Sequence, residues 1–377
     1  MTESHKTSQQ RILFSKIFHP LNDPRRVNQG NHRHKLSDII FLVISAVISG
    51  ASDWDQIEVF GKSQIQWLRK FYPFDNGIPS HDTINRVISA IEPKHFNECF
   101  VKWINEISDL SKGEIVAIDG KRLCGSYDKY SGKSAIHIVS AYASDNKLCL
   151  GQISTNEKSN EITAIPELLN NLAIKGCTIT IDAMGCQTKI AEEIIKKQAD
   201  YLLAVKGNQS SLEQGIQDTI RFTNPIDEDS EIDIGHGRIE NRVCRLYQVT
   251  DHIEEPERWK GFKTIVEIKT ERTIKSTGEV NNMTRYYITN LAKNAKQINR
   301  AVRSHWSIEN NLHWELDVTF GEDASRKRMK NAAENFSIIS KIALSLLNTE
   351  KSVKASKKNK RLLAALNPDF RQKVLNI

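Results

Sequence analysis

The order of apolar and amphipathic segments between residues 114 and 222 constrains the fold of this chain more than any other feature. Short apolar runs bounded by polar turns are typical of strands, and apolar residues three and four apart are typical of helices. In chain order, these patterns predict strands at 115–118, 135–143 and 148–155, a helix at 162–173, a strand at 178–181, a helix at 188–198, a strand at 201–205 and a helix at 211–222. The segment therefore predicts an α/β domain with a β-β-β-α-β-α-β core.

Two of these strands end in an acidic residue. Asp119 follows the apolar run 115–118, and Asp182 follows the run 178–181. Ligands of open α/β sheets gather at the carboxyl ends of the strands. If the two strands are neighbours, their carboxylates repel each other unless a divalent cation lies between them. The pattern favours a metal site, although Asp also ends many strands simply because it suits a turn.

Three antiparallel strands followed by helix, strand, helix and strand form the ribonuclease H pattern. In that fold the acidic residues come from the first strand, the fourth strand and a later helix. A long helical stretch begins near Ala295 and carries Glu309 between His305 and His313. Residues four apart share a helix face, so these three side chains are expected to line up. Glu309 is the expected third carboxylate.

The flanking segments differ in character from this core. Residues 31–110 show helical periodicity throughout, and Ser80 is a good N-cap for a helix that carries Arg86. The segment at about 224–290 reads as a β-rich insertion, and residues 351–377 contain eight Lys or Arg against one Asp. The predicted organisation is a mobile arm at 1–30, an all-helical and DNA-binding module at 31–110, a catalytic domain at 111–350 and a basic C-terminal tail at 351–377.

Net charge, apolar runs and short motifs indicate which partners and cofactors to expect. The formal net charge of +7 is compatible with a polyanionic partner, although many soluble proteins have a similar charge. The longest apolar run, residues 39–48, is half of the roughly 20 residues that cross a membrane. The six cysteines form no CxxC pair, and no phosphate-binding GxxxxGK loop is present. We therefore expect a cytoplasmic protein with no membrane partner, no structural zinc and no ATP.

Several motifs resemble those of one family. They are AIDGKRL around Asp119, TIDAMGCQ around Asp182, HWSIENNLHWELDVTFGED around Glu309, and PSHDTINRV, AVKGNQ and GHGRIENR elsewhere. In this order they resemble the DDE transposases of bacterial insertion sequences, most closely the H-repeat-associated group of Rhs elements. The resemblance extends over about residues 20 to 350.

The resemblance implies a ribonuclease H-like catalytic core and a set of roles. Asp119, Asp182 and Glu309 would hold two Mg²⁺ ions, for which Mn²⁺ can substitute, one activating the attacking oxygen and one stabilising the leaving oxygen. Water would cut double-stranded DNA at the transposon end, and the freed 3′-OH would then join it to target DNA. The family also implies a homodimer or higher assembly on DNA.

The sequence departs from the family at one point. Larger relatives carry Tyr-x2-Arg-x3-Glu-x6-Lys around the third carboxylate, and those places here hold Val302, His305 and Leu316. The phosphate-gripping roles of that Tyr, Arg and Lys therefore do not transfer, and the route of cleavage, through a hairpin or otherwise, stays open. The candidate DNA-binding residues are Lys121, Arg122, Lys206, Arg303, His305, Trp306 and Arg86.

Two other functions remain open. One is a catalytically inert DNA-binding relic of an insertion element, which the intact set of three carboxylates argues against. The other is a metal-dependent nuclease of the same fold that cuts DNA but never joins it. The helical module likewise has two interpretations: its helix after Ser80 reads the major groove, or the module only braces the catalytic domain.

Overall fold

The computed structural model describes residues 18, 20–25, 33–127, 132, 134–155, 161–235, 237–292 and 294–377. Most of the expected arm at 1–30 lies outside these ranges. The strands are β1 Ile115–Arg122, β2 His137–Ala143, β3 Leu148–Thr155, β4 Thr178–Ile181, β5 Asp200–Val205, β6 Asp227–Gly235, β7 Arg238–Gln248, β8 Thr264–Ile274 and β9 Val280–Thr289. The helices are α2 Leu36–Ile48, α3 Trp54–Leu68, α4 His81–Ala90, α5 Pro93–Ile107, α6 Glu161–Asn171, α7 Thr188–Lys196, α8 Ser210–Phe222, α9 Ala295–His305, α10 Trp314–Val318, α11 Ala332–Thr349, α12 Lys357–Leu366 and α13 Pro368–Leu375.

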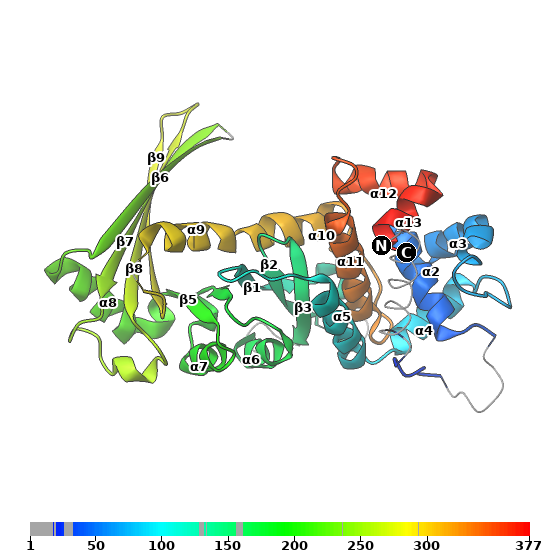
Figure 1. Ribbon diagram of the computed structural model, residues 1–377, viewed down its shortest axis with the longest axis horizontal. Helices are drawn as coiled ribbons and strands as arrows, with labels where there is room; N and C mark the ends of the chain where they lie inside the picture. The colour runs from blue at the N-terminus through cyan, green and yellow to red at the C-terminus, as the bar shows by residue number, and fades with distance from the viewer. Residues whose placement is uncertain are drawn as a thin grey trace, which may run out of the picture.

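A single mixed sheet of nine strands runs through the molecule in the order β3-β2-β1-β4-β5-β9-β8-β7-β6. Strand β1 pairs antiparallel with β2 and parallel with β4, and β4 pairs parallel with β5. Strand β9 then pairs antiparallel with β5, so the β-rich segment extends the same sheet as a long arm (Figure 1). The mixed α/β class expected from the sequence is confirmed.

Helices cover the sheet on both faces. Helices α6 and α7 lie below the central strands in the view of Figure 1, while α9 and α10 run lengthwise above them. Because β4 lies between these layers, all four of its residues are buried, including the polar Thr178 and Thr180. Asp119 and Asp182 directly follow the paired residues of β1 and β4, and Glu309 begins the turn that precedes α10.

The N-terminal helices α2–α5 share their hydrophobic core with the central strands of the sheet. Helix α11 packs against α2, α4 and α5, and α5 also packs against β3. Their apolar side chains belong to one buried cluster with those of the central strands. Helix α2 is buried along nearly its whole length because α11, α12 and α13 cover it. The packing of α2, α4 and α5 against α11, and of α5 against β3, supports the bracing interpretation of these helices.

The C-terminal segment differs from the expected basic tail. Helices α12 and α13 pack on α2, and three of their cationic side chains are buried: Lys360, Arg361 and Arg371. The Arg361 guanidinium donates to the carbonyls of Val47 (3.0 Å) and Ala51 (3.1 Å) at the end of α2. That of Arg371 lies 4.4 Å from the ring centroid of Trp67. These charges are used inside the fold, where a helix C-terminus and an aromatic face stabilise cations.

Within the described ranges, none of the helices is long and apolar enough to cross a membrane.

Candidate active site

Asp119 is the fifth residue of β1 and directly follows four buried apolar residues, and the strand continues to Arg122, beyond its expected end at residue 118. Its side chain is 21% exposed, and its Oδ2 lies 3.6 Å from Nδ1 of His313. The pKa of Asp119 is raised to about 7, mainly by burial and to a lesser extent by the carboxylates of Asp182, Glu309 and Glu161, while one backbone hydrogen bond lowers it.

Asp182 follows β4 at the corresponding position. Ile118 of β1 pairs with Ile181 of β4, so Asp119 and Asp182 each stand one residue beyond this pair. The Oδ1 atom of Asp182 accepts hydrogen bonds from the amides of Met184 (3.1 Å) and Gly185 (3.4 Å). It thereby caps a single 3-10 turn, η4 Ala183–Gly185, and its side chain stays exposed at the sheet edge.

Glu309 opens a π-helical turn, η7 Glu309–His313, between α9 and α10. Such turns are frequent at functional sites because they rotate the side chains that follow. His305 Nδ1 lies 3.0 Å from Thr180 Oγ1 of β4, and His313 faces Asp119, while Glu309 is exposed. This turn departs from the α-helical spacing on which the expected single face of His305, Glu309 and His313 was based.

The donor set fits a hard divalent cation. Within the described residues, no ion pair joins a Lys or Arg to Asp119, Asp182 or Glu309. In the part of the chain that the structure describes, no group of three His, Cys, Asp or Glu side chains is already placed to hold a metal ion. Carboxylate oxygens are the ligands that Mg²⁺ prefers, and a cation would remove the repulsion that raises the pKa of Asp119. The chemistry fits, and the carboxylates would have to draw together around the ion.

Lys121 does not have the environment of a DNA-contacting lysine. Its ammonium lies 2.9 Å from Oε2 of Glu322 and 3.8 Å from Asp323, and it also contacts Asp317. The side chain is only 12% exposed. Although burial alone lowers the pKa of Lys121, Glu322 and Asp317 raise it above its ordinary value. Its charge neutralises these carboxylates, so the structure argues against the expected phosphate contact.

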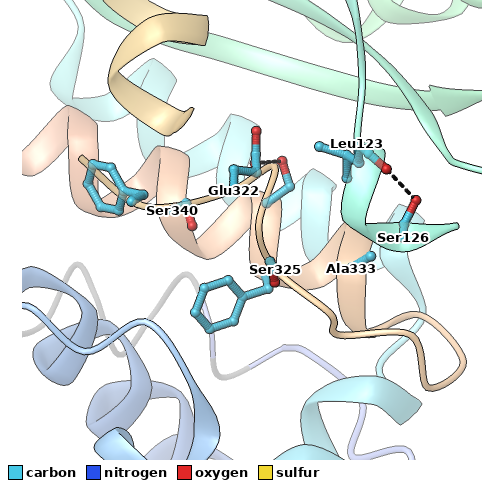
Figure 2. Close-up of a pocket in the computed structure, with 9 residues that line it drawn as sticks. Leu123, Ser126, Glu322, Ser325, Ala333 and Ser340 are labelled. Atoms are coloured by element: carbon cyan, nitrogen blue, oxygen red, sulfur yellow. Dashed lines mark hydrogen bonds between the residues drawn. The ribbon is translucent and has the colours of Figure 1, made fainter. Parts of the chain in front are cut away.

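A polar network continues behind Lys121. Glu322 Oε1 accepts a hydrogen bond from Ser337 Oγ (2.8 Å), and the buried Lys341 ammonium donates to the same Ser337 hydroxyl (2.9 Å). A cavity of about 20 Å³ lies beside Glu322, with Ser126 and Ser325 on its wall (Figure 2). That volume is enough for one water molecule. The network holds the segment after α10 against β1.

The other candidate DNA-binding residues fall into two groups: those whose side chains already contact other protein groups, and those that are exposed. Burial lowers the pKa of His305 to about 4, so its imidazole is neutral at pH 7 and carries no charge for a phosphate. The Arg303 guanidinium pairs with Glu231 (3.1 Å) and Asp233 of β6. These two are poorly placed to grip DNA. Three others are exposed: Arg86, Arg122 and Lys206.

A groove of about 790 Å³ is lined by the C-terminal end of α9, by the turn that follows it and by residues of β6–β9. Trp306 and Glu309 line it together with arginines of the β-rich arm. The Arg285 guanidinium lies 4.8 Å from the ring centroid of Trp306. Trp306, a candidate DNA-binding residue, and Glu309, a candidate catalytic residue, therefore line the same groove, which extends onto the β-rich arm.

Glu161 is a buried carboxylate beside β1 that the sequence pattern did not reveal. It begins α6 and is buried, and its charge reaches Asp119. The apolar periodicity of this helix starts at the next residue, so Glu161 resembled an ordinary polar residue of the first turn. Only the packing of α6 on the sheet brings it to β1.

Comparison with known proteins agrees with the motifs. The model of the transposase DDE domain matches residues 110–346, and that of the DDE_Tnp_1-associated domain matches residues 15–104. A "Putative transposase YncI" of Escherichia coli O157:H7 is 48% identical over 92% of this chain and 90% of its own length. An "H repeat-associated putative transposase YhhI" of E. coli K12 is 44% identical over 91% and 92%. An "Inactive transposase YbfQ" of the same strain is 57% identical over only 15% of this chain and 67% of its own length.

Proposed function

The chain belongs to the family of transposases with a DDE domain, and from this premise we propose that it cleaves DNA at transposon ends and joins those ends to target DNA. The proposal includes a ribonuclease H-like catalytic core. The strand order β3-β2-β1-β4-β5, with β1 parallel to β4 and antiparallel to β2, supports it.

The observation that carries the proposal is the position of the carboxylates. Asp119 and Asp182 each stand one residue beyond Ile118 and Ile181, which pair between neighbouring strands, and Glu309 begins the turn between α9 and α10. Carboxylates gathered at one place repel one another and destabilise the fold, so such a cluster is typical of functional sites. Metal-dependent phosphoryl transfer is one function that needs it. The resemblance of the motifs implies that the family's three carboxylates correspond to these residues.

In this mechanism Asp119, Asp182 and Glu309 would hold two Mg²⁺ ions. When bound, the ions supply activation of the attacking oxygen and neutralisation of the leaving oxygen in an in-line displacement. Asp182 is oriented by the two amides of its turn, and His313 faces the outer oxygen of Asp119. Burial lowers the pKa of His313 to about 3, so its imidazole is neutral at pH 7 and does not compete as a cation beside Asp119.

Variants of the three carboxylates test this function. DNA that flanks the coding region is incubated with the protein and Mg²⁺, and cleavage is followed on gels. Asp119→Ala, Asp182→Ala and Glu309→Gln should each abolish cleavage and leave DNA binding, measured by fluorescence anisotropy, near wild type. Glu254→Gln, at an exposed position on the loop after β7, is the matched control. Cleavage by all three variants at the wild-type rate would rule out the assignment.

The two alternatives predict different products. An inert relic binds DNA without cutting it, and one short relative is named as inactive. A nuclease of the same fold cuts but forms no joined product. A strand-transfer assay with pre-cleaved 3′-OH ends separates both from a transposase, and analytical ultracentrifugation with two DNA ends tests the expected dimer.

A further inference from the structure

The groove beside Glu309 contains five arginines, most of which already pair with carboxylates of the β-rich arm. The five are Arg238, Arg242, Arg272, Arg285 and Arg303. Glu240 of β7 pairs with both Arg242 and Arg272. Two carboxylates of β6 pair with Arg303. A guanidinium held in this way would have to give up its partner before it could bind another anion, so these three arginines serve contacts within the protein.

Arg285 of β9 has a different environment. Among the residues that the structure describes, no carboxylate lies within ion-pair distance of its guanidinium, which lies 4.8 Å from the ring centroid of Trp306. The Trp306 side chain is itself 39% exposed. An aromatic ring attracts and orients a guanidinium but carries no opposite charge, so the positive charge of Arg285 stays available. Within the same described ranges Arg238 also lacks a carboxylate partner, but it begins β7 at the tip of the β6–β7 hairpin.

Arg285 lies close to the segments that carry two of the candidate carboxylates. Trp306, against which it packs, precedes Glu309 by three residues and lines the same groove. His305 is the neighbour of Trp306 in the chain. Burial and, to a lesser extent, the charge of Arg285 lower the pKa of His305 to about 4, while the charge of Asp182 raises it. One imidazole is thus within electrostatic reach of both Arg285 and Asp182, so the guanidinium stands where a DNA strand that reaches the carboxylates would pass.

The last turn of α9 supplies no free cation of its own at this place. His305 is neutral at pH 7, and Arg303 is already paired. Phosphoryl transfer places negative charge on phosphate oxygens, which carboxylates alone repel. The planar guanidinium of an arginine can bind two such oxygens at once.

We propose that Arg285 binds a backbone phosphate of the DNA strand that enters the groove beside Glu309. The inference rests on the proposed function, because it assigns a contact with the same DNA. The competing explanation is structural: Arg285 only covers the ring of Trp306 and otherwise faces water.

Salt titration of DNA binding distinguishes these explanations. A labelled duplex of the DNA that flanks the coding region is bound without Mg²⁺, and the affinity is measured by fluorescence anisotropy over a range of NaCl concentrations. Each phosphate that a cation neutralises contributes about −0.9 to the slope of log K against log salt concentration. Arg285→Met keeps apolar contact with Trp306 and should make the slope shallower by about 0.9. Arg285→Lys keeps the charge and should retain the wild-type slope.

The matched control is Arg221→Met. Arg221 lies on α8, outside the groove, with its guanidinium 5.3 Å from the ring centroid of the exposed Phe222. It is therefore another arginine stacked on an aromatic ring, and its replacement should leave the slope unchanged. Circular dichroism and Tm check the folding of each variant. If Arg285→Met does not fold, Arg285→Gln, which also removes the charge, replaces it and should give the same shallower slope.

Cleavage gives a second readout. With Mg²⁺ and saturating protein, the single-turnover rate of Arg285→Met should fall by about 100-fold, and Arg285→Lys should recover part of the loss. A wild-type slope or a wild-type cleavage rate in Arg285→Met overturns the assignment and leaves the proposed function standing. A wild-type protein that binds this DNA without cutting it overturns the proposed function, while the slope still decides the role of Arg285. A wild-type protein that does not bind the DNA overturns both.

Discussion

Replacement of Lys121 by Met tests whether this lysine belongs to the fold. The variant keeps most of the aliphatic stem but removes the ammonium that pairs with Glu322 and Asp317. The Glu322 side chain is 7% exposed, so its charge loses a partner without regaining water. Breaking a buried pair from one side typically costs about 3–5 kcal/mol.

The expected loss lies at the lower end of that range. Glu322 keeps its hydrogen bond from Ser337 and the charge of Lys341, while Asp317 is partly exposed and can be hydrated. We therefore expect Lys121→Met to lower the free energy of unfolding by about 3 kcal/mol. Adding Glu322→Gln removes the orphaned charge and should restore part of the loss, with a coupling of about 1 kcal/mol or more.

Urea unfolding followed by tryptophan fluorescence measures the effect. The control is Lys35→Met, because Lys35 and Asp75 form a pair of similar length, 2.9 Å, whose side chains are 60% and 62% exposed. Such a pair contributes about 0–1 kcal/mol. If Lys121→Met costs no more than Lys35→Met, or if its only defect is weaker DNA binding, then the lysine faces DNA and the structural account of it is wrong.

Two further predictions concern packing and pH. Gly125→Ala should cost about 2 kcal/mol in urea unfolding, since its Cβ would lie 2.0 Å from the backbone carbonyl of Ser325, whereas Gly207→Ala, with open space around it, should cost far less. Glu58 accepts a hydrogen bond from His81 and raises the pKa of that imidazole, so NMR titration of Glu58→Gln should give a lower His81 pKa than wild type. The stabilisation from this pair is present below pH 6.5 and is lost as pH rises through the raised pKa of the folded protein. An unchanged His81 pKa in the variant would contradict the assigned cause.

The sequence predicted the strands of the core because their signals are local. The apolar run 115–118 and the alternating Thr and Ile of 178–181 both favour strands, and the structure has strands at both. Asp182 follows its strand as expected, Asp119 lies inside β1, and β1 and β4 are neighbours. The helix that carries Glu309 was also expected, but its π-helical turn was not, since such a turn has no simple sequence pattern.

Charge was the property that the sequence left undetermined. Along the chain, Lys121, Arg361 and Arg371 resemble any surface cations, and Glu161 resembles any first-turn glutamate. The fold brings Glu322 to Lys121, carbonyls of α2 to Arg361, and the Gly120 backbone to Glu161. Whether a charged side chain is solvated, paired or held against other charges depends on partners that lie far away in sequence. Local apolar patterning therefore determined where the strands run, and only tertiary packing decided which charges serve the fold and which gather at the candidate site.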